Sequence, residues 1–179
     1  LVFQNLVKEI AKLVKGNASS AQYIFDTRTC RETMAREFIT LLGFISTVPN
    51  GRTFLDPILT SPDVEPSLVQ LGGCPQFDFL SRLILMSLDV TDPGWPFSRR
   101  LMQSWLSNPK ASVSLRLCAN DVLRTLLRSR SLVGPCEEWA ISMVMLQLDC
   151  TDETVMETTL DILMDSADTP RLLAIIVEQ

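Results

Sequence analysis

Apolar residues recur every three to four positions along most of this 179-residue chain. That spacing places them on one face of an α-helix. Runs of β-branched residues that alternate with polar ones, which would indicate strands, are missing. The pattern therefore predicts an all-α fold. In the second part of the chain, the expected helices cover residues 77–90, 95–108, 112–131, 135–150, 152–168 and 169–179.

The first part of the chain shows the same periodicity. An apolar stripe over residues 6–14 predicts one helix, and Thr29 with Glu32 forms a capping box that predicts the start of another. A short helix is expected at 51–59. Residues 60–76 are rich in proline and glycine, so we expect a loop there. The expected apolar face of the second helix comprises Met34, Phe38, Leu41, Leu42 and Ile45.

The spacing of the helices indicates a repeat architecture. Successive helix pairs occupy about 35 to 45 residues, which is typical of HEAT and armadillo units. We therefore expect one continuous α-solenoid domain, with helical segments at 1–59 and 77–179 joined by the loop at 60–76. An excised solenoid exposes apolar end faces, so we also expect that the isolated fragment can dimerise.

A short internal echo supports repetition. The pattern Leu-Asp-x-Thr-Asp occurs in "SLDVTDPG" at 87–94 and in "QLDCTDET" at 147–154, each time at the end of an expected apolar helix. In each copy, an aspartate or threonine is expected to accept from the free N–H groups of the next helix; in the second copy that residue is Thr151 or Asp152. The side chains expected to face the core after this cap are Val155, Leu160, Ile162 and Leu163.

The residue types argue against catalysis. Histidine is absent, which removes serine–histidine and cysteine–histidine mechanisms. The five cysteines, at 30, 74, 118, 136 and 150, form no CxxC pair, so reduced, buried thiols are expected rather than zinc ligands. Gly72-Gly73 is followed by Cys-Pro, which is unlike a phosphate-binding loop. We therefore expect no enzymatic activity, no metal and no cofactor.

Charge and hydropathy limit the partners. The formal net charge is −5, whereas nucleic-acid binding requires a basic footprint, so no nucleic-acid partner is expected. No run of eighteen apolar residues occurs, so the chain is not expected to insert into a membrane. The three tryptophans, Trp95, Trp105 and Trp139, are expected to pack in the core with the indole N–H reaching an acceptor; an exposed aromatic anchor is the alternative.

Basic and acidic residues separate along the chain. Residues 96–131 contain seven basic side chains and one acidic, whereas residues 137–168 contain nine acidic and none basic. Ion pairs between stacked helices would explain this segregation, and a pair of docking surfaces is the alternative. The candidate basic surface, for a partner or a phosphate, comprises Arg99, Arg100, Arg124, Arg128 and Arg130. The candidate acidic surface comprises Glu157, Asp161, Asp165 and Asp168.

Four stretches, taken in order, carry a family resemblance. They are "REFITLLGFISTVPNGRTFL" (36–55), "FLSRLILMSLD" (79–89), "RLCANDVLRTLLR" (116–128) and "EEWAISMVMLQLDCTDETVMETTLDILMDSAD" (137–168). Together they resemble Rictor-type proteins, the large scaffold subunit of the second TOR kinase complex. The match rests on the ordered combination, because no single stretch is diagnostic.

The resemblance implies a non-catalytic armadillo/HEAT-like scaffold segment in TOR signalling. It implies TOR kinase and the Sin-type subunit as partners, and a cytoplasmic location with peripheral membrane association through the complex. Two alternatives stay open. Part of this region in the family has been likened to the N-terminal module of Ras exchange factors, which would make the chain a GTPase-regulating module. A generic solenoid adaptor is the other.

Overall fold

The computed structural model describes residues 34–178 apart from residue 93 and residues 130–133. The helix expected at 6–14 and the capping box at Thr29 and Glu32 lie outside the described residues. Within them, the chain forms helices joined by short connections and contains no strand, which confirms the all-α prediction. The α-helices are α3 (Ala35–Ser46), α4 (Pro49–Leu59), α5 (Glu65–Leu71), α6 (Asp78–Ser87), α7 (Phe97–Leu106), α8 (Val113–Arg128), α9 (Pro135–Leu146), α10 (Glu153–Ala167) and α11 (Pro170–Glu178), with 3₁₀ turns η2 (Pro75–Phe77) and η3 (Gln147–Asp149).

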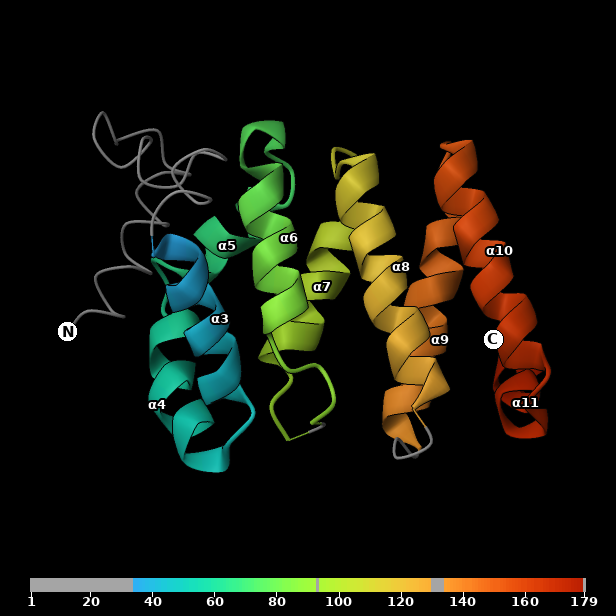
Figure 1. The fold of residues 1–179 in the computed structure, drawn as a ribbon, viewed down its shortest axis with the longest axis horizontal. Coiled ribbons are helices and arrows are strands. Elements are labelled where there is room, and N and C mark those ends of the chain that lie inside the picture. The colour runs from blue at the N-terminus through green and yellow to red at the C-terminus, as the bar shows by residue number, and fades with distance from the viewer. Residues whose placement is uncertain (1–33, 93, 130–133, 179) are drawn as a thin grey trace.

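The helices stack in two layers that follow the order of the sequence (Figure 1). Helices α3, α6, α8 and α10 run parallel and side by side in one layer, and α4, α5, α7, α9 and α11 lie behind them. The helices of the first layer begin at residues 35, 78, 113 and 153, at intervals of about 35 to 45 residues. A helical-repeat fragment is thus confirmed, and its assignment to the armadillo or HEAT class stays a prediction.

Local sequence signals explain where several helices begin. Ser112 caps α8, because its hydroxyl accepts from the N–H of Leu115 at 3.0 Å. Asp152 caps α10 by accepting from the N–H of Val155 at 3.1 Å, as predicted for the second copy of the echo. Pro135 begins α9, where its missing N–H costs nothing.

The loop expected over residues 60–76 is wrong for its middle part, which forms α5. Pro66 lies in the first turn of α5, a position that tolerates proline. Leu68 and Leu71 are buried, and the backbone carbonyl of Leu68 accepts from the indole N–H of Trp105 at 2.8 Å. Gly72 ends α5 against the same ring: a Cβ there would lie 2.2 Å from Cδ1 of Trp105. Packing on α7 therefore outweighs the loop-like composition.

The core lies between the two layers and includes two of the three tryptophans. Trp105 is 1% exposed and Trp95 is 5% exposed, and the indole N–H of Trp95 donates to Oδ1 of Asp56 at 3.0 Å. Both match the predicted packing of an indole with a polar acceptor. Trp139 is half-buried, and its N–H has no acceptor among the described residues.

Two expected apolar faces need correction. On α10, Val155 and Ile162 are buried as predicted, but Leu160 is 47% exposed and Thr159 takes the buried position. The reason is a polar contact with α8: the side-chain amide of Asn120 donates to the hydroxyl of Thr159 at 3.0 Å. On α3, Leu42 is buried as predicted, but Met34 and Leu41, which were also expected in the core, are exposed. Ile39, which was not predicted, is buried.

Candidate functional site

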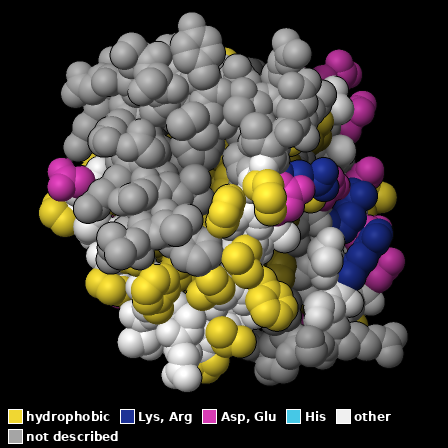
Figure 2. Space-filling view, turned by 60° about the vertical axis from the view of Figure 1, so that its left-hand side comes forward, with side chains coloured by type: hydrophobic (Ala, Val, Ile, Leu, Met, Phe, Trp, Pro, Cys, Tyr) yellow, Lys and Arg dark blue, Asp and Glu magenta, His cyan; other side chains and the backbone are white. Residues whose placement is uncertain are grey.

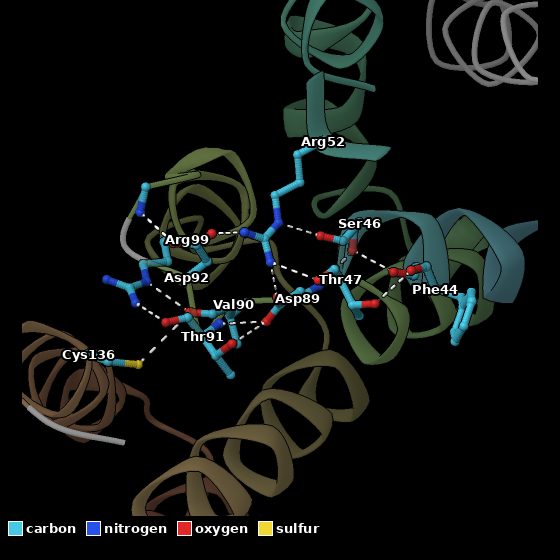
Figure 3. A network of polar contacts seen from close by, with 12 residues as sticks. Phe44, Ser46, Thr47, Arg52, Asp89, Val90, Thr91, Asp92, Arg99 and Cys136 are labelled. Atoms are coloured by element: carbon cyan, nitrogen blue, oxygen red, sulfur yellow. Dashed lines mark hydrogen bonds and ion pairs between the residues drawn. The ribbon is translucent and has the colours of Figure 1, made fainter. Parts of the chain in front are cut away.

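The first copy of the echo forms a polar network around one arginine of α4 (Figure 3). The Arg52 guanidinium donates to the backbone carbonyls of Ser46, at 2.6 Å, and Thr47, at 3.2 Å, which lie at the end of α3. It also pairs with the carboxylate of Asp89 at 2.9 Å and with that of Asp92. Arg52 thereby occupies orphan carbonyls at a helix end and links them to the connection after α6.

The predicted cap in this copy is therefore wrong. The carboxylate of Asp89 accepts from the backbone N–H of Thr91 at 2.8 Å, and that of Asp92 accepts from the N–H of Gly94 at 2.7 Å. Helix α7 begins only at Phe97, without a side-chain cap. The two aspartates instead bind backbone N–H groups within the connection between α6 and α7 and pair with Arg52. The two copies therefore share a sequence pattern, but only the second one caps a helix.

Arg99, expected on a basic surface, is buried and 9% exposed. Its Nε donates to the carbonyl of Val90 at 2.9 Å and its Nη2 to that of Thr91 at 3.0 Å (Figure 3). The guanidinium carbon lies 5.2 Å from the ring centroid of Trp139, a cation–π distance. Arg99 is thus part of the packing between α7, the 88–91 connection and α9, and its place on a docking surface was predicted wrongly.

The remaining predicted basic residues do not form one patch. Arg100 is exposed and pairs with Glu65 of α5 at 3.1 Å. Arg124 is half-buried: Nη2 donates to the carbonyl of Thr158 at 3.5 Å, and Nε has no partner among the described residues. Arg128 is exposed and pairs with an acidic residue of α10. Arg130 lies outside the described residues.

The predicted acidic residues share the exposed side of α10 and its end. Asp165 pairs with Arg128 at 2.6 Å, so this part of the segregated charge is used between neighbouring helices. Glu157, Asp161 and Asp168 are exposed and form no ion pair within the part of the chain that the structure describes. Ion pairing accounts for one of the four carboxylates.

One buried arginine is central to the packing, and its role was not predicted. Arg116 of α8 is 8% exposed. Its guanidinium donates to the carbonyls of Leu106, at 3.0 Å, and Asn108, at 2.9 Å, at the end of α7, and to Oε1 of Gln147 at 2.8 Å. A signal was available: Arg116 follows Leu115 and lies three residues before Ala119, inside the apolar stripe of its helix, where a charged side chain needs partners.

A groove of about 640 Å³ lies between α6, the 88–91 connection and α8. Its lining combines Leu88, Leu117, Val122 and Leu126 with polar side chains from both helices. Cys118 also lines it, and burial raises the pKa of its thiol to about 11. The thiol is therefore protonated near neutral pH and is a poor nucleophile.

An exposed apolar face lies on α3, α4 and the turn between them, the side brought forward in Figure 2. Phe44 is 70% exposed, and Val48 and Phe54 are each 46% exposed.

Among the described residues, no group of three or more histidine, cysteine, aspartate or glutamate side chains could hold a metal ion. The same residues include no helix long and apolar enough to cross a membrane. Burial raises the pKa of the Cys136 thiol as well. The described surface offers a groove, charged residues and an exposed apolar face.

Comparison with known proteins gives relatives but no fold template. The chain is 31% identical over 147 residues to Protein pianissimo A of Dictyostelium discoideum. This alignment covers 82% of this chain and 12% of that protein. It is 27% identical over 168 residues to the rapamycin-insensitive companion of mTOR of mouse and of human, which covers 92% of this chain and 9% of each relative. No family model and no solved structure matches.

The chain thus spans about a tenth of the length of the curated relatives that it matches. The alignments extend over 82% and 92% of the chain. The chain is therefore similar, over nearly all of its own length, to a segment of Pianissimo A and of the companion of mTOR.

Proposed function

We propose that this chain is a non-catalytic helical-repeat segment of a Rictor-like scaffold subunit of TOR complex two. The observation that carries the proposal is the similarity to a companion of mTOR over 92% of the chain. An all-helical stack without a metal-binding cluster among its described residues is in keeping with a scaffold. The expected partners are TOR kinase and the Sin-type subunit, and the expected location is cytoplasmic, with peripheral membrane association through the complex.

The segment would act by holding its helix surfaces in a fixed arrangement. Buried arginines tie helix ends of one repeat to the next, as Arg116 does between α7 and Gln147. Such contacts make the relative position of neighbouring helices specific as well as stable. A rigid stack of this kind can present partner sites at set distances from one another.

Co-purification tests the proposal. Affinity-tagged full-length protein should capture TOR kinase and the Sin-type subunit from cells. Leu123→Asp, which places a charge at a fully buried position of α8, should reduce capture strongly, because an unpaired buried charge unfolds the repeat. Val113→Asp introduces the same charge at a position 40% exposed in the first turn of the same helix, away from the lining of the groove, and should leave capture unchanged. Absence of TOR kinase from the wild-type eluate would contradict the proposal.

A further inference from the structure

The groove between α6 and α8 is apolar inside and open at the surface. Leu117 and Val122 are half-buried along one wall, and Leu126 is buried. Met86 of α6 stands at the rim and is 70% exposed. At about 640 Å³, the groove is large enough to take side chains of a bound peptide. Exposed methionine adapts to different apolar partners, so the rim is suited to binding.

The register of α8 and α10 places further acidic residues on the neighbouring helix at the level of this groove. Helices α8 and α10 run parallel (Figure 1), and Asn120 donates to the hydroxyls of Thr158, at 3.1 Å, and Thr159. Asp121, which lines the groove, therefore lies at the level of Glu157 and Asp161 on the neighbouring helix.

The charges of this face are unbalanced. Arg82, at the groove, is paired with Asp78 at 2.9 Å, and Arg128 is paired with Asp165. The carboxylates that form no ion pair with described residues are Asp121, Glu157, Asp161 and Asp168, and all four are exposed. Arg124, half-buried between α8 and α10, also forms no ion pair with described residues and offsets one of these four charges. The face therefore has a surplus of negative charge beside an apolar groove.

We propose that this face, the α6–α8 groove with the carboxylates of Asp121, Glu157 and Asp161, binds a basic amphipathic segment of a partner protein. An apolar side chain of the segment inserts beside Met86, Leu117 and Val122. Lysine or arginine side chains on either side of it face the carboxylates. Charge complementarity selects this occupant, because a nucleic acid or an anionic membrane surface would be repelled.

Fluorescence anisotropy with designed peptides tests the occupant. The purified full chain is titrated into three labelled peptides of about twelve residues, a length that spans such a groove. One peptide carries leucines spaced three and four apart with lysines between them, a second has glutamate in place of lysine, and a third has serine in place of leucine. The proposal expects binding of the first peptide alone, weakened by salt. Equal binding of the first and third peptides, or no binding of the first, would overturn it.

Matched variants locate the site. Asp121→Lys combined with Glu157→Lys should weaken binding of the leucine–lysine peptide on the order of tenfold at low salt, because two favourable charges become repulsive. Glu138→Lys combined with Glu178→Lys makes the same change in net charge on exposed parts of α9 and α11, and should have little effect. An equal loss in both double variants would show a general charge effect and refute the site.

The apolar half of the proposal has its own control. Met86→Ser removes the exposed rim side chain without opening the core and should weaken the peptide several-fold. Val177→Ser removes an apolar side chain that is 77% exposed on α11 and should not change binding. Unchanged affinity in Met86→Ser would refute the apolar contact, whatever the charge variants show. The measurement requires no TOR kinase, so its outcome is separate from that of co-purification.

Discussion

Replacing Arg116 by methionine should destabilise the stack more than the same replacement of an exposed arginine. The buried guanidinium donates at 3.0 Å to Leu106, at 2.9 Å to Asn108 and at 2.8 Å to Gln147. Methionine keeps most of the aliphatic volume but donates no hydrogen bond, which leaves two carbonyls and an amide oxygen without this partner. A hydrogen bond from a charged donor contributes about 1.5–3 kcal/mol, and relief from burying the charge offsets part of the loss. We expect the free energy of unfolding to fall by about 3–5 kcal/mol.

Urea denaturation followed by circular dichroism measures the loss, since the helices unfold with a large signal. Arg100→Met is the matched control: the same substitution removes an exposed pair with Glu65 and should cost about 0–1 kcal/mol. Gln147→Leu added to Arg116→Met should cost about 1 kcal/mol less than the sum of the single changes, because the amide oxygen is no longer left unpaired. A loss in Arg116→Met no larger than that in Arg100→Met would refute the reasoning.

Three further measurements follow. Gly72→Ala should lower stability by about 2 kcal/mol or more and shift the fluorescence of Trp105, because the new Cβ would lie 2.2 Å from the ring; unaltered stability would contradict the packing. Asn120→Ala should cost about 1–2 kcal/mol in thermal or urea denaturation, through loss of the contacts with Thr158 and Thr159, with no loss as the contrary result. Burial raises the pKa of the Cys118 thiol from 9.0 to about 11, and the thiolate is the reactive form. Alkylation of Cys118 at pH 9 should therefore be slower in the native protein than in urea, and should accelerate towards pH 11. Equal rates at pH 9 in the two conditions would contradict the burial.

Much of the helix order could be predicted, because apolar periodicity and caps are local. Asp152 at the start of α10 is one example, because a carboxylate just before an amphipathic run can accept from the free N–H groups of the first helical turn. The helix α5 could not be predicted from its prolines and glycines. Its formation depends on Trp105, 37 positions from Leu68, whose ring packs against Gly72 and binds the carbonyl of Leu68.

The charged residues show the limit of composition. Arg99 and Arg100 are adjacent, yet one is buried against backbone carbonyls and the other is exposed beside Glu65. Composition counts them alike, whereas their environments differ because consecutive residues of an α-helix point in directions about 100° apart. The carbonyls that bind Arg99 and Arg116 belong to other segments of the chain, so the sequence around each arginine does not predict these contacts. Pairing of Arg128 with Asp165 does follow from the separation of charge, once the two helices are neighbours.

The parallel stacking of α3, α6, α8 and α10 has a kinetic consequence. The extensive contacts in the described part join helices that are neighbours in the stack, within a few tens of residues along the chain. If α10 and α11 detached from α8 and α9, the contact between α3 and α6 would stay in place. Unfolding can therefore advance helix by helix along the stack instead of in one step. Low sequence separation of contacts also favours rapid refolding.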